Sequence, residues 1–210
     1  MEKRWGWPNA YVQSGIQNIC IITGRGKRAI EDHFDVSFEL EHLLSSRHQE
    51  DLLSTVRKIS ALIEVTYIRQ REALGLGHAV FRAKNAIGEN PFAVVLSDDV
   101  IHSKVPCLLQ LMEVYEGYNH PVLALMIVPP ERISAHGVVS GGMVSVNRQG
   151  QPIYKIDALV EKPTPGSAPS DLAIIGRYVL TPDVFQCLES TCPGTGDEIQ
   201  LTDALHRRRD

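Results

Sequence analysis

The chain has 210 residues, of which 43% are hydrophobic and 22% charged, and its 21 basic and 25 acidic side chains leave a formal net charge of -4. At about 150 residues per domain, this length allows one large domain or two small ones with a buried core. The charge balance argues against a dedicated nucleic-acid binder. No stretch reaches the roughly 18 apolar residues of a membrane span, and the four cysteines show no C-x-x-C spacing. We therefore expect a cytoplasmic chain that binds neither nucleic acid nor membrane.

Short apolar runs alternate with segments of helical periodicity through the first two thirds of the chain. Strands are predicted at 16–23, 62–68, 92–96 and 122–128, and helices at 40–59, 78–87 and 108–115. This alternation predicts an α/β fold with a mostly parallel sheet flanked by helices.

The pattern changes after Ser134, where turn residues separate short strands. Residues 137–140, 143–146 and 153–160 are expected to form a small antiparallel β appendage of hairpin strands. A turn is expected at Gly141–Gly142, and Asn147–Gly150 lies between the last two segments. A strand at 172–180 and a helix at 183–189 follow.

Ligands in a parallel sheet collect at the carboxyl ends of the strands, because loops and helix N-termini converge there. After the first predicted strand, Gly24-Arg-Gly-Lys-Arg-Ala29 formally matches a dinucleotide fingerprint. A dinucleotide site also needs a second strand that ends in an acidic residue about 20 positions later. In this sequence a long helical segment occupies that interval. A structural glycine turn is therefore the favoured interpretation.

The segment after the second predicted strand has features of a nucleotide site. Gly75 and Gly77 permit close backbone approach, and the amide of Gln70 offers a donor and an acceptor in one plane, which suits the edge of a nucleobase. A plain glycine turn is an equal alternative from composition alone.

Charged residues follow two further strands. Asp98 and Asp99 come directly after a buried strand, and paired carboxylates there suit Mg²⁺ bound together with a phosphate, although either aspartate alone also suits a helix N-cap. Glu161 and Lys162 end a strand of the appendage. The glutamate accepts hydrogen bonds from hydroxyls and the lysine neutralises a phosphate, whereas a solvated ion pair is the alternative.

Several blocks of the sequence occur in a familiar order. They are residues 23–35, 38–41, 70 with 73–79, 97–99, 136–139, 160–163, 172–178 and 196–203. Together they closely resemble the bacterial UTP-glucose-1-phosphate uridylyltransferases, also called UDP-glucose pyrophosphorylases. The resemblance extends from about Tyr11 to Leu205.

The resemblance implies a nucleotidyltransferase-type, Rossmann-like fold for residues 11–210, which form a partial domain after an unmatched segment, 1–10. It implies that glucose 1-phosphate attacks the α-phosphate of UTP, so that UDP-glucose forms and pyrophosphate leaves. Such a reaction depends on positioning and charge neutralisation.

The resemblance also assigns roles to individual residues. It implies that Gln70 and the backbone of Gly75 hold the uracil, that Asp98 binds the Mg²⁺ cofactor, that Gly137 and Glu161 hold the glucose hydroxyls, and that Lys162 binds the sugar phosphate as the catalytic residue.

The chain departs from the family pattern at both ends. A glycine-rich loop of the form G-x-G-T-R-x-L-P and a K-x-x-P-K stretch have no counterpart before Ile16. A second Mg²⁺ aspartate and the terminal helices used for homo-oligomer formation have none after Asp203. We therefore expect truncation at both ends, with little activity and poor folding. One alternative to an active enzyme is a chain that only binds a sugar nucleotide or has no activity. A further alternative is an NAD-binding module at Gly24–Ala29.

Overall fold

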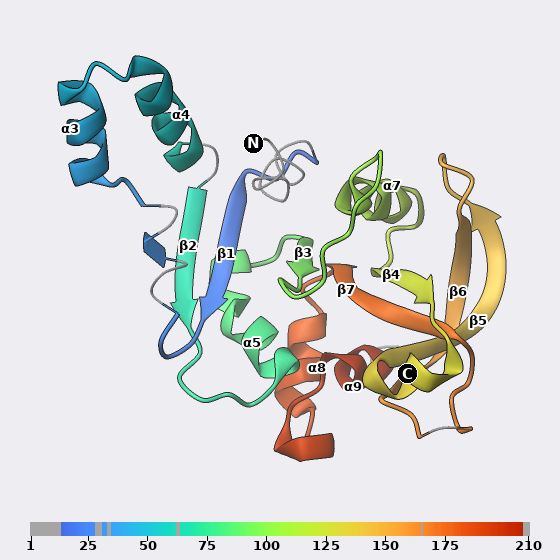
Figure 1. Cartoon of the computed structure of the whole chain (residues 1–210). Helices are drawn as coiled ribbons and strands as arrows, with labels where there is room; N and C mark the ends of the chain where they lie inside the picture. Colours follow the sequence, from blue (N-terminus) through green and yellow to red (C-terminus); the bar gives the residue numbers. More distant parts are fainter. Residues whose placement is uncertain (1–13, 28–30, 33–34, 62–63, 165, 208–210) are drawn as a thin grey trace. The chain divides into compact units, whose positions relative to one another are not determined.

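The computed structural model describes residues 14–27, 31–32, 35–61, 64–164 and 166–207, and the chain divides into two compact units, Met1–Glu72 and Ala73–Asp210 (Figure 1). Segment 1–10, the end of the glycine fingerprint at Arg28–Ala29 and the predicted strand start at Leu62 lie outside the described residues.

The first unit contains a parallel pair of strands and two helices. Strands β1 (Asn18–Thr23) and β2 (Glu64–Arg69) pair in parallel from their first to their last residues. Helices α3 (Phe38–Ser46) and α4 (Glu50–Ser60) lie between them in the sequence. The single helical segment predicted at 40–59 is therefore two helices, separated at His48, where φ is 52°.

The second unit is built on a five-stranded sheet. Its strands are β3 (Phe92–Val95), β4 (Val122–Ile127), β5 (Gly137–Val146), β6 (Pro152–Glu161) and β7 (Leu172–Leu180). The order is β3-β7-β5-β6, with β4 also on β7, and every described pairing is antiparallel. This differs from the predicted mostly parallel sheet, because β7 inserts between β3 and β4 and runs against both of them.

Helices cover both faces of this sheet, as the sequence predicts. They are α5 (Leu76–Arg82), α6 (Lys84–Ile87), α7 (Cys107–Tyr118), α8 (Val184–Ser190) and α9 (Leu201–Arg207), with short 3-10 turns η2 (Pro130–Ala135) and η3 (Thr195–Asp197). In Figure 1, α7 lies on one side of β7, and α8 and α9 lie on the other. No helix within the described ranges is long and apolar enough to cross a membrane.

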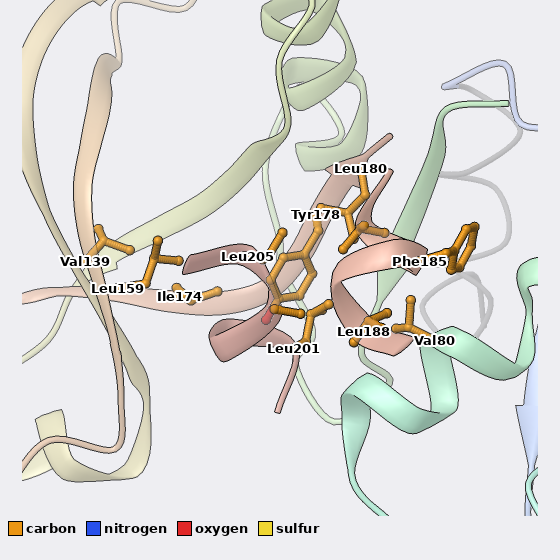
Figure 2. Close-up of a cluster of buried hydrophobic side chains, with 12 residues drawn as sticks. Val80, Val139, Leu159, Ile174, Tyr178, Leu180, Phe185, Leu188, Leu201 and Leu205 are labelled. Atoms are coloured by element: carbon orange, nitrogen blue, oxygen red, sulfur yellow. The ribbon is translucent and has the colours of Figure 1, made fainter. Parts of the chain in front are cut away.

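The core of the second unit lies between β7 and the helices α5, α8 and α9. Tyr178 and Leu180 of β7 belong to one cluster of buried side chains that includes Leu188 of α8 and Leu201 of α9 (Figure 2). Ala173 of β7 belongs to a second cluster of buried side chains, whose other members are Val128, Ile133 and Val138. Since both faces of β7 are covered, its sequence is almost continuously apolar, as is usual for a strand of this kind.

The β5–β6 hairpin confirms the predicted antiparallel strands, which join the main sheet through β7, but the turn predicted at Gly141–Gly142 is wrong. Gly141 and Gly142 lie within β5 rather than in a turn, and a side chain at Gly141 would collide with the backbone oxygen of Lys155 on β6. The turn lies at Asn147–Gln151, where Oδ1 of Asn147 accepts hydrogen bonds from the backbone of Gln149 at 3.0 Å and of Gln151 at 2.8 Å. The sequence could not distinguish a glycine needed for close strand approach from one needed for a turn.

Candidate functional site

The side chain of Glu161, at the end of β6, is held by a threonine from α9. Oγ1 of Thr202 donates a hydrogen bond of 2.6 Å to Oε2 of Glu161. Thr202 is only 6% exposed, in the first turn of α9, whereas Glu161 is half-buried. A hydrogen bond to a carboxylate is short and strong, so it orients Glu161 while Oε1 has no donor among the described residues.

Gly137 lies directly opposite Glu161 in the hairpin. A Cβ atom at Gly137 would lie 3.0 Å from Oε2 of Glu161, 3.3 Å from Oγ1 of Thr202 and 3.2 Å from Cδ1 of Ile174. These distances are shorter than ordinary van der Waals contacts. A Cβ atom at this position would therefore push the side-chain atoms of Glu161, Thr202 and Ile174 away by a few tenths of an ångström.

Lys162 follows Glu161 in a left-handed backbone conformation, with φ of 45°. This conformation costs a non-glycine residue about 1–2 kcal/mol, and such strain is concentrated at functional sites. The Lys162 N–H donates to the backbone oxygen of His136 at 3.1 Å, so the chain ends of β5 and β6 are tied together here. The Lys162 side chain is exposed.

The loop after β3, Leu96–Asp99, carries the predicted metal ligand Asp98 and is anchored to β7. The N–H of Leu96 donates to the oxygen of Gly176 at 2.9 Å. Nη1 of Arg177 donates to the oxygen of Leu96 at 2.7 Å, and Nη2 donates to the oxygen of Asp99. Asp98 itself is exposed, and Asp99 is half-buried.

The carboxylates of Asp98, Asp99 and Glu161 act on the same buried group, Tyr178. Burial raises the pKa of the Tyr178 phenol well above its usual range, and the negative charges of Glu161, Asp99 and Asp98 raise it further. All three carboxylates are therefore close enough to Tyr178 to act on it through space. Glu161 and the two aspartates after β3 therefore both contribute to the raised pKa of Tyr178.

Gly75 is the predicted nucleotide-binding residue of the second unit. It has φ of 92°, and a Cβ atom there would lie 2.7 Å from Cβ of Glu198. On either side of Gly75, the oxygen of Leu74 accepts from Ile199 N–H at 2.8 Å, and Gly77 N–H donates to Ile199 oxygen at 2.8 Å. The loop is therefore tied to the segment that precedes α9.

The residues of the first unit have simpler surroundings. Gln70 follows β2, is half-buried, and donates its backbone N–H to the oxygen of Thr23 at 2.8 Å. Gly24 and Lys27 form a turn closed by a 3.4 Å hydrogen bond from Lys27 N–H, and Gly26 has φ of 82°. The described part of the glycine-rich segment after β1 is thus a glycine turn, which the sequence favoured over a dinucleotide-binding loop.

The structure adds two residues to which the sequence assigned no role. Thr202 and Arg177 both lie in blocks that carry the family resemblance, but nothing local shows what they contact. Burial would have identified both residues, because buried polar side chains in proteins almost always have hydrogen-bond partners. The sequence does not show that Thr202 and Arg177 are buried. The structure brings Gly137, Glu161 and Lys162 together, and Thr202 completes that group.

Comparisons with known proteins place these features in a wider context. A family model described as nucleotidyl transferase matches residues 8–208. Two relatives in Bacillus subtilis (strain 168) are UTP-glucose-1-phosphate uridylyltransferase YngB, 48% identical over 92% of this chain and 63% of the relative, and a UTP-glucose-1-phosphate uridylyltransferase, 47% identical over 93% and 65%.

Solved structures of similar fold include UDP-glucose pyrophosphorylases. An apo form superimposes with a TM-score of 0.84 at 39% identity, covering 96% of this chain and 73% of that chain. A complex with UDP-glucose gives a TM-score of 0.83 at 38% identity, covering 96% and 72%. The chain spans 63% to 66% of the length of the first curated relatives that it matches.

Proposed function

The chain belongs to the nucleotidyl transferase family, and from this premise we propose that it transfers uridylyl from UTP to glucose 1-phosphate, giving UDP-glucose and pyrophosphate. The family membership confirms the predicted resemblance and the α/β nucleotidyltransferase fold class. The observation that carries the proposed activity is the group formed by Gly137, Glu161 and Thr202 beside Lys162, because it combines a hydroxyl acceptor with a cation at the ends of adjacent strands.

In the proposed reaction, a phosphate oxygen of glucose 1-phosphate forms a bond to the α-phosphorus of UTP, and the bond from that phosphorus to the bridging oxygen of pyrophosphate breaks. Glu161, oriented by Thr202, accepts hydrogen bonds from glucose hydroxyls. Gly137 leaves room for the carboxylate of Glu161 and the hydroxyl of Thr202 beside the sugar, and the Lys162 ammonium balances the phosphate charge. Such residues act by positioning and electrostatic stabilisation, which supply most of the catalysis in phosphoryl-type transfers.

Asp98 would hold Mg²⁺, which supplies neutralisation of the negative charge on the phosphates. An exposed carboxylate followed by a second aspartate has the hard oxygen donors that Mg²⁺ prefers. Mg²⁺ is usually bound by one or two carboxylates together with water and substrate phosphates. The lack of any group of three or more His, Cys, Asp or Glu ligands in the described part of the chain is compatible with that mode of binding.

The base of the nucleotide is proposed to bind at Gln70 and Gly75. Glu198 and Ile199 approach Gly75 closely and fix its backbone, which is the part of this residue proposed to contact the base. The relatives compared above, one of them solved with UDP-glucose, support uracil as the base and glucose as the sugar.

The alternative of a chain that only binds a sugar nucleotide is not favoured, since the relatives compared above are named for the complete reaction. A pyrophosphate-release assay with UTP, glucose 1-phosphate and Mg²⁺ tests the proposal, together with isothermal titration of UDP-glucose. Turnover supports it, whereas UDP-glucose binding without turnover supports the alternative.

Substitution of Lys162 gives a sharper test of the same site. We expect Lys162→Ala to lower kcat at least about 100-fold, because loss of one preorganised charge at a reacting phosphate typically costs that much. Lys155→Ala is the matched control, since Lys155 is exposed on β6, the strand that ends just before Lys162. Equal activity of the two variants would contradict the role proposed for Lys162.

A further inference from the structure

Arg177 is a buried cation whose hydrogen bonds go to backbone oxygens. It is 7% exposed, and within the described ranges it makes no ion pair with a carboxylate. Buried charged side chains are rare unless they have strong partners. Here the partners are the carbonyl oxygens of Leu96 at 2.7 Å, Gly176 at 2.9 Å, and Asp99.

Two of these oxygens enclose the dipeptide that carries the proposed metal ligand. Leu96 and Asp99 are the residues on either side of Ser97–Asp98, so one guanidinium group binds both ends of that segment. Ser97 and Asp98 are themselves exposed. Their position therefore depends on the Arg177 contacts more than on packing of their own side chains.

The backbone of β7 is shaped for this contact. Leu123 of β4 pairs with Tyr178, whereas Leu125 pairs with Ile174, so β7 has more residues than β4 over this stretch and forms a β-bulge. Gly176 lies in the bulge with φ of 64°. A Cβ atom there would lie 2.9 Å from Cβ of Leu96 and 3.1 Å from Oδ2 of Asp99. Bulges of this kind often redirect side chains next to active sites.

The charges around the loop give a second reason for a buried cation. Asp98 and Asp99 are adjacent in the sequence, and two neighbouring carboxylates repel each other. A guanidinium group that touches the backbone of Asp99 offsets part of this repulsion. It does so without occupying the carboxylate oxygens, because it binds carbonyl groups instead.

We infer that Arg177 is a positioning residue for divalent-metal binding, which holds the Ser97–Asp98 segment so that the Asp98 carboxylate is presented to the cation. This inference rests on the proposed function, in which Asp98 binds Mg²⁺. Lysine is a poor substitute, because a single ammonium group lacks the planar fork of donors that reaches separate oxygens.

The first experiment measures Mn²⁺ binding directly, from the loss of the free Mn²⁺ signal in electron paramagnetic resonance with UDP-glucose present. Mn²⁺ is the probe because it prefers the same oxygen ligands as Mg²⁺. We expect Arg177→Lys to raise the Mn²⁺ dissociation constant about tenfold, the usual effect of losing a residue that supports a metal ligand. Arg148→Lys, at an arginine whose side chain is 82% exposed, should bind Mn²⁺ as the wild-type chain does.

A second measurement distinguishes positioning from general stability. In the turnover assay, a positioning role raises the Mg²⁺ concentration at half-maximal rate, and saturating Mg²⁺ largely restores kcat. A purely structural role lowers the melting temperature and the active fraction but leaves the half-maximal Mg²⁺ concentration unchanged. The latter result would overturn the inference.

Ser97→Gly provides a variant that leaves Arg177 and the buried residues intact. Glycine adds backbone freedom worth roughly 0.5–1 kcal/mol, so we expect a rise of about threefold in the Mn²⁺ dissociation constant. This variant decides the matter if Arg177→Lys does not fold, and wild-type affinity in Ser97→Gly would then overturn the inference. A wild-type chain that neither binds Mn²⁺ nor releases pyrophosphate contradicts the proposed function itself. That result differs from failure of the role inferred for Arg177, in which the wild-type chain binds Mn²⁺ and is active.

Discussion

Single residues at the ends of β5 and β6 determine the geometry of the proposed sugar site. Gly137, Glu161 and Thr202 come from three different elements, and each limits where the others can lie. The Thr202 hydrogen bond leaves one carboxylate oxygen of Glu161 for a ligand. A hydrogen bond to a charged group is worth about 1.5–3 kcal/mol, so its geometry has a measurable effect on affinity.

The first residue-scale prediction concerns two glycines of the same strand. Gly137→Ala should lower the affinity for UDP-glucose about tenfold. The added Cβ atom would lie 3.0 Å from Oε2 of Glu161 and would displace this oxygen. Gly142→Ala is the control, since a Cβ atom at Gly142 has nothing within 4 Å. Isothermal titration of both purified variants gives the comparison. Equal affinities would show that the position of Glu161 does not govern sugar binding.

At the scale of elements, α5 depends on close packing against the segment before α9. The N–H of Gly77 donates to the oxygen of Ile199 at 2.8 Å, and a Cβ atom at Gly77 would lie 2.7 Å from the same oxygen and 2.9 Å from Cδ2 of Leu188. The glycine is therefore required by the approach of two backbones, although alanine has the higher helix propensity.

This packing predicts that a glycine-to-alanine substitution has opposite effects on the free energy of unfolding in α5 and in α7. Gly77→Ala should lower the free energy of unfolding by about 1–3 kcal/mol, the usual cost of overpacking. Gly117→Ala in α7 should raise it by up to about 1 kcal/mol, because that glycine is exposed and has nothing within 4 Å. Urea unfolding followed by circular dichroism measures both. Stabilisation by Gly77→Ala would contradict the packing described here.

At the scale of the molecule, the core of the second unit buries an ionisable phenol next to acidic residues. The pKa of Tyr178 is raised first by burial and then by Glu161, Asp99 and Asp98. The stability associated with the neutral phenol is fully present below the pKa of an unfolded tyrosine, about 10. It is lost as the pH rises from there through the folded pKa.

We therefore predict that alkaline destabilisation is partly due to Tyr178. Between about pH 8 and about pH 11, the melting temperature of Tyr178→Phe should fall less steeply than that of the wild-type chain, because phenylalanine has no proton to lose. Tyr118→Phe is the control, since Tyr118 is 46% exposed. Identical slopes for all three proteins would show that the phenol of Tyr178 does not limit stability at high pH.

The sequence by itself determined the class of the fold and most of its elements. Short apolar runs such as Phe92–Leu96 and Leu172–Leu180, and the apolar residues of α4 and α7 at helical spacing, are local patterns that are readable without knowledge of neighbours. The same holds for the candidates at strand ends, because Asp98, Glu161 and Lys162 directly follow or end apolar runs. Family resemblance then assigned them roles.

Only the tertiary structure decided which strands pair and which residues support the site. The insertion of β7 between β3 and β4 depends on contacts between distant segments, so an alternating pattern predicted parallel neighbours where the structure has antiparallel ones. Arg177 reaches Leu96 across 81 positions of sequence, and Thr202 reaches Glu161 across 41. Periodicity and local motifs act over a few residues, whereas a hydrogen bond between such distant positions exists only once the sheet and helices have packed.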